Sequence, residues 1–411
     1  MRMSEKVSEE AARQLRILES GIEQMLPEGE LLRKLERSLS TGEPLKVKFG
    51  VDPTSPDLHL GHAVPLRKLR QFQQFGHLVY LIIGDFTGRV GDPSQRDATR
   101  PHITADEVEE NARTYMAQAF RVLDPERTVL RNNSEWLAPL TFEELLGLTS
   151  HFTVARLLER DDFSRRYRDQ VSIGLHEFLY PVMQAYDSVA ILADVEMGGT
   201  DQVFNLLAGR ELQRSLGQEP QAIVTVPILV GLDGEKKMSK SLGNHVGLTD
   251  PPEEMFGKVM SIADELMVDY FKLATDLNPE VINSIAEGLK QGKLHPAQVK
   301  RRLAAEIVAL YWGEEAALQA QEHFDRVFKQ KEAPEEMPEY SVTEPVRMAT
   351  LLVQTGLAKS LSDARRLVEQ KGVKLNDIVL ENADLELSPK DLHGAVIQKG
   401  KRHFVRIKRT E

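Results

Sequence analysis

Two predicted elements meet in the segment Val47-Lys48-Phe49-Gly50-Val51-Asp52-Pro53-Thr54-Ser55-Pro56-Asp57-Leu58-His59-Leu60-Gly61-His62. Residues 47–51 predict a strand, and residues 59–75 predict the helix that follows it. His59 and His62 are three positions apart, so they lie on the same side of the first helical turn. A helix N-terminus attracts phosphate because its N–H groups are unpaired and its dipole is positive there. The segment therefore predicts a strand–turn–helix unit that holds a phosphate group.

The rest of the N-terminal half continues the alternation of strands and helices. Residues 78–83 form an almost uninterrupted apolar run, which is typical of a buried parallel strand. Further strands are predicted at 190–194 and 222–229, and further helices at 105–123, 175–189 and 202–216. This order predicts an α/β fold, with a doubly wound, Rossmann-like parallel sheet that binds ligands at the carboxyl ends of its strands.

A second motif, Lys237-Met238-Ser239-Lys240-Ser241, lies in a Gly-rich loop almost 180 residues further on. Lysines on such a loop can close over a pyrophosphate leaving group and neutralise its charge. Taken alone, each motif has an ordinary explanation. The histidines can be capping or packing residues, and the lysines can belong to a solvated surface turn. The two motifs together, in this order and spacing, favour nucleotide chemistry.

Three more segments carry polar residues at predicted strand ends or on one helix face. The first is Gly84-Asp85-Phe86-Thr87-Gly88-Arg89-Val90-Gly91-Asp92-Pro93-Ser94, and another is Gly198-Gly199-Thr200-Asp201-Gln202. In the third, Tyr180, Gln184 and Asp187 share one face of a helix whose intervening residues are mostly apolar. A polar trio is costly to bury without partners, so ligand contacts are expected there; a solvated helix face is the alternative.

Composition narrows the classes of protein that the chain can belong to. Its 411 residues are 41% hydrophobic and 28% charged, as is usual for globular proteins, and no stretch reaches the ~18 apolar residues of a membrane span. The N-terminus resembles neither a signal peptide nor a transit peptide. The absence of cysteine excludes disulfides and thiolate zinc sites. We therefore expect a cytoplasmic protein with no membrane partner and no zinc.

The charge is unevenly distributed along the chain. The net charge is −11, but residues 346–411 contain 13 Lys and Arg against 8 Asp and Glu. A basic C-terminal module on an acidic body indicates a local anion-binding surface, although a basic solvated edge remains possible. Residues 331–345, rich in Glu and Pro, predict a linker before this module.

The two signature motifs together resemble those of class I aminoacyl-tRNA synthetases, and the whole chain is similar to the bacterial tyrosyl-tRNA synthetase family. The resemblance implies a tyrosine–tRNA ligase that uses ATP with Mg²⁺ to form tyrosyl-adenylate and then acylates the 3′ end of tRNA(Tyr). It also implies a homodimer. The implied domains are a catalytic domain (residues 1–230), a lysine-motif loop with a helical anticodon-recognition domain (231–330), the linker (331–345) and a small α+β S4-like RNA-binding domain (346–411).

The same resemblance assigns roles to individual residues. Catalysis falls to Thr54, His59, His62, Lys237 and Lys240. ATP contacts fall to Asp52, Gly61, Arg96, Arg100, Gly198, Gly199, Asp201 and Ser239. Tyrosine contacts fall to Asp92, Tyr180, Gln184, Asp187 and Gln202, with Asp187 accepting a hydrogen bond from the substrate hydroxyl. RNA contacts fall to Lys359, Arg365, Arg366, Lys371 and Lys374, with Ser362 expected to cap the helix that displays the two arginines. No metal site is expected.

The chain departs from the family pattern at Lys48. Many family members carry there a Tyr that also touches the substrate hydroxyl, so this contact is missing.

Three other functions remain open at this point. A tryptophanyl-tRNA synthetase shares both motifs, and an aspartate at Asp187 suits an indole N–H as well. An RNA-binding protein without catalysis could reuse the scaffold. A small-molecule nucleotidyltransferase could carry the histidine turn without needing an RNA-binding tail.

Overall fold

The structure is a computed structural model that describes residues 3–53, 57–92, 105–328, 337–376, 378–400 and 403–409. The chain divides into two compact units, Met1–Leu318 and Gln319–Glu411, called unit 1 and unit 2 below. None of the helices in these ranges has the length and apolar character required to cross a membrane.

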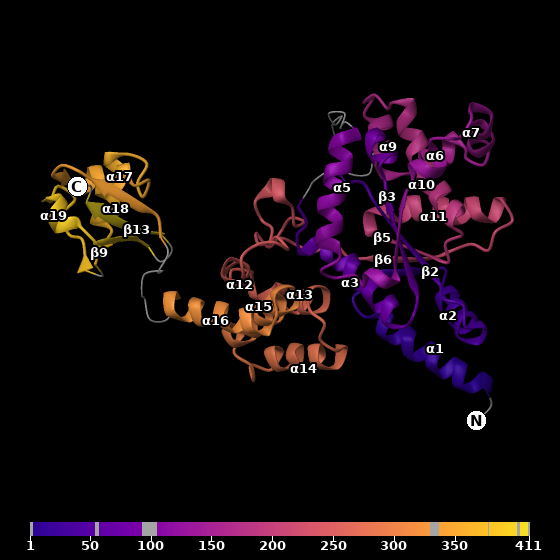
Figure 1. Ribbon diagram of the computed structural model, residues 1–411, viewed down its shortest axis with the longest axis horizontal. Helices are drawn as coiled ribbons and strands as arrows, with labels where there is room; N and C mark the ends of the chain where they lie inside the picture. The colour runs from indigo at the N-terminus through magenta and orange to yellow at the C-terminus, as the bar shows by residue number, and fades with distance from the viewer. Residues whose placement is uncertain are drawn as a thin grey trace. The chain divides into compact units, whose positions relative to one another are not determined.

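A six-stranded sheet forms the centre of unit 1 (Figure 1). Its strands are β1 (Gln24–Leu26), β2 (Lys46–Val51), β3 (Leu78–Ile83), β4 (Thr128–Asn132), β5 (Val195–Gly199) and β6 (Ala222–Val226). Their order is β1-β6-β5-β2-β3-β4, and all neighbouring pairs are parallel except β1 with β6. The strand order reverses between β2 and β5, which is where a doubly wound sheet binds its ligands. The predicted doubly wound α/β fold is confirmed.

Helices cover both faces of this sheet. The α-helices between Met3 and Ser215 are α1 (Met3–Glu19), α2 (Glu30–Thr41), α3 (Leu60–Gln74), α4 (Thr87–Val90), α5 (Ala105–Ala119), α6 (Ser134–Leu137), α7 (Phe142–Thr149), α8 (Val154–Leu157), α9 (Asp161–Arg168), α10 (Leu175–Ile191) and α11 (Val203–Ser215). Figure 1 shows α10 and α11 on one side of the strands and α3 and α5 on the other. Because parallel strands are buried on both faces, residues such as Val47, Leu81 and Val195 are fully enclosed.

A group of helices completes unit 1. It consists of α12 (Pro252–Met260), α13 (Met267–Ala274), α14 (Pro279–Lys290), α15 (Pro296–Trp312) and the first part of α16 (Glu314–Phe328). Arg67 of α3 donates to the main-chain oxygens of Leu273, near the end of α13, and of Thr275, directly after it. These buried charge-assisted bonds join the helical group to the sheet side of unit 1.

One predicted strand is wrong. Residues 190–194 do not form a strand, because α10 continues to Ile191 and Leu192 ends it in the left-handed conformation with φ 54°. The strand itself, β5, begins at Val195. A short apolar run does not distinguish a buried strand from the last turn of a buried helix. Strands β1 and β4 were not predicted.

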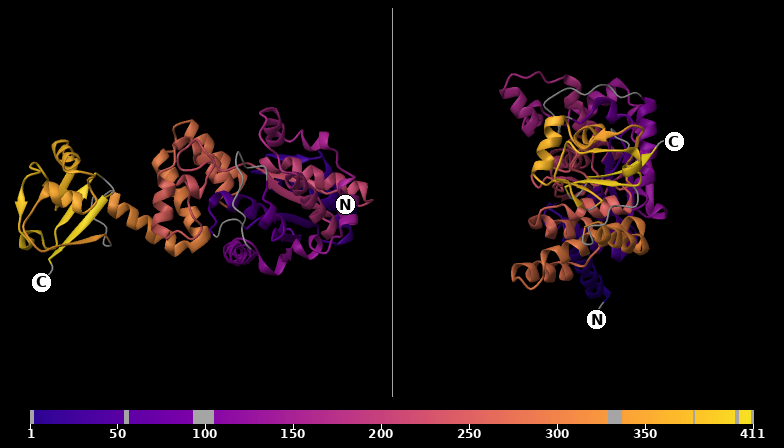
Figure 2. Two further views of the ribbon diagram at one scale, coloured as in Figure 1. Left: turned by 90° about the horizontal axis from the view of Figure 1, so that it is seen from above. Right: turned by 90° about the vertical axis from the view of Figure 1, so that its left-hand side faces the viewer.

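Unit 2 contains a five-stranded sheet in the order β10-β9-β12-β13-β7 and a two-stranded sheet of β8 and β11. The elements are β7 (Glu339–Val342), β8 (Val346–Arg347), α17 (Met348–Gln354), α18 (Leu361–Glu369), β9 (Val373–Leu375), β10 (Ile378–Val379), β11 (Glu386–Leu387), α19 (Pro389–Leu392), β12 (Val396–Lys399) and β13 (His403–Arg409). Figure 2 shows this unit, in yellow, as a sheet with helices against it. A core that includes Met348, Leu351, Ile397 and Ile407 joins them.

The predicted linker at 331–345 is wrong in its second half. Residues 339–342 form β7, which pairs in parallel with β13. Val342 is buried in the core of unit 2, and Tyr340 packs against that core. Two apolar residues that alternate with polar ones are enough for an edge strand, but among the Glu and Pro residues of this segment they give little signal.

Candidate functional site at the carboxyl end of the sheet

His59 and His62 lie at the start of α3, the helix that follows β2 in the chain. Their rings stack with centroids 3.9 Å apart, and the main-chain N–H of His59 donates to His62 Nδ1 at 3.3 Å. His59 is buried, and its Nδ1 has no hydrogen-bond partner among the described residues. Burial, together with the neighbouring His62 and His245, lowers the pKa of His59 to about 3. At neutral pH this imidazole is therefore an uncharged hydrogen-bonding group.

The lysine motif lies beside these histidines. The chain that follows it runs antiparallel to the start of α3: Leu60 donates to the Val246 oxygen at 3.0 Å, and Leu248 donates to the Leu58 oxygen at 2.9 Å. A Cβ atom on Gly61 would lie 3.6 Å from Cβ of Met238. The two motifs, far apart in sequence, are thus in contact.

Asn244 shapes the loop that carries the lysines. Its Oδ1 accepts from the Ser239 N–H at 2.8 Å, and its Nδ2 donates to the Lys237 main-chain oxygen at 3.1 Å and to Asp233 at 2.8 Å. On the same loop, Lys240 forms an ion pair with Asp57, which lies just before His59. Neither Asn244 nor Asp57 was predicted as a site residue.

A hydrogen-bond network connects the ends of β2, β3 and β4. Tyr180 Oη donates to Asp52 Oδ2 at 2.8 Å, and Thr87 Oγ1 donates to Asp52 Oδ1 at 2.8 Å. Asn133 then donates from Nδ2 to Thr87 Oγ1 at 2.9 Å. Burial raises the pKa of Tyr180 well above its ordinary value, with Asp52 adding to the effect, so its hydroxyl remains protonated.

The close approach of β3 to Asp52 requires a glycine at position 84. A Cβ atom there would lie 1.9 Å from Asp52 Oδ1 and 2.4 Å from Thr87 Oγ1.

Asp187 lies at the other end of this network and is buried. It accepts from Trp136 Nε1 at 2.8 Å and from Asn133 Nδ2 at 3.4 Å. Burial raises the pKa of Asp187 to about 7, although Lys48, Trp136 and Asn133 each lower it. Trp136 and Asn133 follow β4, a strand that was not predicted, so neither residue was predicted for the site.

Asp92 and Gln202 form a second polar group, around a buried arginine. Gln202 Nε2 donates to Asp92 Oδ2 at 2.8 Å. Arg160 donates to Asp92 Oδ1 at 3.0 Å and to Asn205 Oδ1 at 3.1 Å. Arg160 is buried, although it lies in a polar segment rich in Arg and Asp. Residue type alone does not distinguish a buried arginine from its exposed neighbours in such a segment.

Other predicted residues occupy the same edge of the sheet or lie outside the described ranges. Gly198 and Gly199 end β5, Asp201 follows them, and Ser239 lies on the lysine loop. Gln184 projects from α10, where its side chain donates to Glu196 at 3.2 Å. Thr54, Arg96 and Arg100 lie outside the described residues. In the ranges that the structure covers, no group of three or more His, Asp or Glu side chains is arranged to hold a metal ion.

The predicted RNA-contacting residues all lie in unit 2. Arg365 and Arg366 project from α18 and are exposed, each paired with an aspartate (Asp384 and Asp363). Lys359 precedes that helix, Lys371 follows it with φ 55°, and Lys374 lies on β9. The expected helix cap at Ser362 is wrong, because Ser360 caps α18 by accepting from the Asp363 N–H. The N-cap of the helix therefore lies two residues earlier than predicted.

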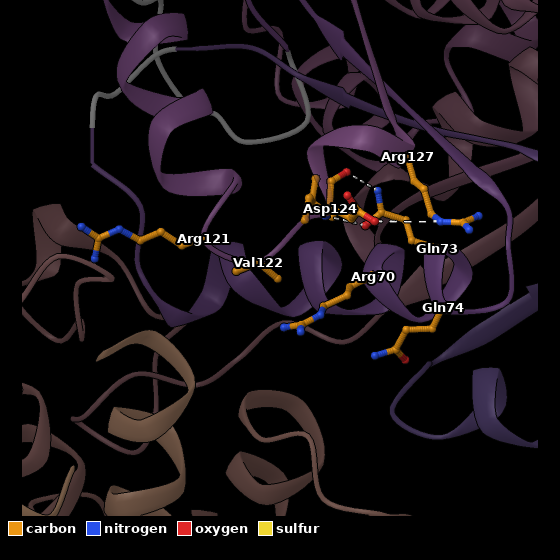
Figure 3. Close-up of a pocket in the computed structure, with 8 residues that line it drawn as sticks. Arg70, Gln73, Gln74, Arg121, Val122, Asp124 and Arg127 are labelled. Atoms are coloured by element: carbon orange, nitrogen blue, oxygen red, sulfur yellow. Dashed lines mark hydrogen bonds and ion pairs between the residues drawn. The ribbon is translucent and has the colours of Figure 1, made fainter. Parts of the chain in front are cut away.

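A separate hollow of about 480 Å³ lies at the far end of α3 (Figure 3). Its lining consists of Arg70, Gln73, Gln74, Arg121, Val122, Leu123, Asp124 and Arg127. None of the predicted site residues lines it.

The chain is similar to known proteins over almost its whole length. Residues 40–329 match the family described as tRNA synthetases class I (W and Y), and residues 329–407 match the tyrosine–tRNA ligase SYY-like C-terminal domain. The tyrosine–tRNA ligase of Moorella thermoacetica is 54% identical over 403 residues, covering 98% of this chain and 97% of the relative. That of Geobacter sulfurreducens is 51% identical over 399 residues, covering 96% and 98%.

A solved structure supports the fold. A C-terminally truncated mitochondrial tyrosyl-tRNA synthetase of Aspergillus nidulans superposes with a TM-score of 0.63 at 21% identity, covering 79% of this chain and 99% of that one. The near-complete matches at about half identity are to ligases of tyrosine, and they separate this chain from the tryptophan enzymes of the same class. The chain therefore belongs to the tyrosine–tRNA ligases, a family of class I aminoacyl-tRNA synthetases.

Proposed function

We propose that this tyrosine–tRNA ligase carries out its chemistry at the carboxyl end of the sheet, with the two signature motifs on the nucleotide and the α10 residues on the amino acid. The observation that carries the proposal is the contact between the start of α3 and the segment after the lysine motif. That contact supports the proposal, because it brings two segments with groups suited to phosphate, far apart in the sequence, next to each other.

In the first step a tyrosine carboxylate oxygen bonds to the α-phosphorus of ATP as the bond to pyrophosphate breaks. Negative charge collects on the pyrophosphate, and Lys237 and Lys240 neutralise it. His59 and His62 donate hydrogen bonds to phosphate oxygens. Thr54, Arg96 and Arg100 add phosphate contacts. The ion pair of Lys240 with Asp57 must open for this contact, so ATP phosphates compete with Asp57 for the lysine.

The rest of the nucleotide lies along the glycine-rich strand ends. Gly198, Gly199 and Asp201 contact the ribose, and Asp52, Gly61 and Ser239 line the remainder of the ATP pocket. ATP enters as its Mg²⁺ complex, because Mg²⁺ in such sites is held mainly by substrate phosphates.

The amino acid is held at both ends. Its ammonium group lies among Asp92, Tyr180 and Gln184, with Gln202 near the carboxylate. Asp187 accepts the hydrogen bond of the phenolic hydroxyl. A site built to bond a hydroxyl rejects phenylalanine, which lacks it, because the buried carboxylate would then have no substrate partner.

In the second step a hydroxyl of the terminal ribose of tRNA(Tyr) attacks the tyrosyl carbonyl carbon, and AMP leaves. We assign residues 1–230 to this chemistry, residues 231–330 to the lysine loop and the approach to the anticodon stem, and residues 346–411 to RNA binding. Lys359, Arg365, Arg366, Lys371 and Lys374 bind backbone phosphates. The reaction belongs in the cytoplasm, where tRNA is charged for translation.

We also propose a homodimer. Large apolar side chains between β4 and the first turn of α10 are exposed, among them Phe142 at 76%, Val154 at 65% and Leu175 at 79%. Apolar residues gathered on one segment are typical of a protein interface.

ATP–pyrophosphate exchange on the purified protein tests the proposed chemistry. It is run with tyrosine, tryptophan, phenylalanine or no amino acid. Exchange that depends on tyrosine alone is the expected result. Exchange with tryptophan would overturn the role of Asp187, and no exchange with any amino acid would overturn the catalytic assignment.

A further inference from the structure

A buried ion pair lies beneath the amino acid pocket. Lys48 on β2 and Glu196 on β5 are directly opposite each other in the parallel pairing of the two strands. The Lys48 ammonium lies 2.8 Å from Glu196 Oε1, and the two side chains are 0% and 1% exposed. Burying an ion pair costs desolvation free energy, which further hydrogen bonds must offset. The groups that make those bonds indicate which side chains the pair positions.

Glu196 accepts hydrogen bonds from four side chains. Lys48 and Gln184 donate to Oε1 at 2.8 and 3.2 Å, while Ser188 (at 3.1 Å) and Gln221 donate to Oε2. Every donor that surrounds this side chain therefore requires an acceptor at its centre. A carboxylate provides acceptors only, whereas a glutamine would place an N–H group among N–H donors.

This arrangement fixes the orientation of the Gln184 amide. Its NH₂ group faces Glu196 because a carboxylate cannot donate. The amide oxygen of Gln184 is consequently directed away from Glu196. An ammonium group offers only donors, so it needs that oxygen and would be repelled by the reversed amide.

Lys48 holds the backbone of the same residue. Its ammonium donates to the Gln184 main-chain oxygen at 2.9 Å and to Ser188 Oγ at 2.8 Å. Those bonds tie α10 to β2 at the turn of the helix that carries the tyrosine-contacting side chains. The residue that departs from the family pattern is thus engaged with the helix and not directed at the substrate hydroxyl.

We infer that Glu196 is a positioning residue for recognition of the tyrosine ammonium group, acting through the Gln184 amide, with Lys48 as its counter-ion and as the anchor of α10. This inference rests on the proposed contact between Gln184 and the substrate ammonium.

The test compares tyrosine with 3-(4-hydroxyphenyl)propionate, which lacks the amino group. The Glu196→Gln variant is expected to bind tyrosine about tenfold more weakly, as for the loss of one hydrogen bond to a charged group, while its affinity for the propionate stays unchanged. In the exchange assay KM for tyrosine rises by the same factor, whereas kcat and KM for ATP change little. If the role of Glu196 were purely structural, the variant would lose affinity for tyrosine and for the propionate to the same extent.

Gln221→Met is the matched control. It removes a donor from Oε2 of the same carboxylate but leaves the bond to Gln184 in place. Its affinities for both ligands are expected to equal those of the unmodified protein. Equal losses for tyrosine and the propionate in Glu196→Gln, or no loss for either, would overturn the inference.

Two further variants keep the test decisive. If Glu196→Gln leaves Lys48 uncompensated and does not fold, Lys48→Met combined with Glu196→Met removes both charges, a change that buried pairs often tolerate. The same selective loss of tyrosine affinity is expected. Gln184→Met tests the underlying contact: if it does not weaken tyrosine binding, the proposed role of Gln184 fails. If it does and the Glu196 variants do not, only the positioning role of Glu196 fails.

Discussion

At the scale of single residues, the proposed hydrogen bond between Asp187 and the substrate hydroxyl depends on the pKa of that carboxyl. Burial raises it to about 7, and the hydrogen bond from Trp136 is among the contacts that oppose this rise. The ionised form accepts the substrate O–H, whereas the protonated form offers a competing donor. Efficiency with tyrosine should therefore increase as the pH rises through the pKa of this carboxyl.

Replacing Trp136 with Phe removes that hydrogen bond and raises the pKa of Asp187 further. We expect kcat/KM for tyrosine to rise with pH around 7 in the unmodified protein, and the midpoint to move up by about one pH unit in Trp136→Phe. Exchange rates at low tyrosine between pH 6 and 9 measure this. Trp312→Phe, on α15, is the control. An unmoved midpoint in Trp136→Phe would show that the indole does not tune Asp187.

Gly84 tests the position of Asp52. The added methyl of Gly84→Ala would overlap Asp52 Oδ1 and Thr87 Oγ1, so both side chains must shift and the bond from Tyr180 is lost. We expect about 1–3 kcal/mol of lost stability and at least a tenfold loss of exchange activity. Gly257→Ala on α12, where a Cβ would meet nothing within 4 Å, should keep full activity. Urea unfolding measures the stability of both variants, and ATP–pyrophosphate exchange measures their activity.

At the scale of elements, the strongly apolar and periodic segments were predictable from sequence. Strands β2 and β3 and helices α3 and α11 follow the predicted boundaries closely. Failures occurred where one pattern fits two structures, as at 190–194, or where a short strand gave no pattern, as at β4. Because β4 was not predicted, Asn133 and Trp136 could not be assigned to the site. Whether a residue reaches a site depends on the strand or helix that positions it.

The loop after β6 illustrates what sequence motifs omit. Its lysines were identified from their residue types, but the Asn244 side chain that shapes the loop is recognisable only from its contacts. Asn244→Ala should free the loop and lower kcat of adenylate formation about 10–100-fold, with little change in KM for tyrosine, since the role proposed for the lysines is to neutralise the leaving group. Leu242→Ala on the same loop is the control. A rise in KM for tyrosine with normal kcat would contradict this account.

At the scale of the whole molecule, the exposed apolar residues of unit 1 predict its association. Phe142 and Leu146 project from α7 at 76% and 54% exposure. Replacing both with Asp would bury two charges in the proposed interface, which should weaken the dimer by several kcal/mol. Sedimentation velocity should find monomers for this variant and dimers for Ile378→Asp in unit 2. Dimers in both would place the interface elsewhere.

The stability of the molecule should fall in mild acid because it buries neutral histidines. His77 accepts from the Leu45 N–H at 3.3 Å, and burial lowers its pKa to about 4, a shift that Asp194 partly opposes. Since its folded pKa lies below the unfolded value of about 6.5, the contribution of His77 is complete above that value and is lost as the pH falls toward 4. At pH 5 the loss from this residue alone should be about 2 kcal/mol.

His77→Gln isolates this contribution. Glutamine can accept from the same N–H but does not titrate, so the variant should lose about 2 kcal/mol less than the unmodified protein between pH 7.5 and pH 5. Urea unfolding at the two pH values gives the difference directly. Comparing the change with pH, and not the stability at one pH, cancels any packing cost of the substitution. If both proteins lost the same stability between the two pH values, His77 would not contribute to the acid response. Other groups, such as the buried His59 at the start of α3, would then dominate it.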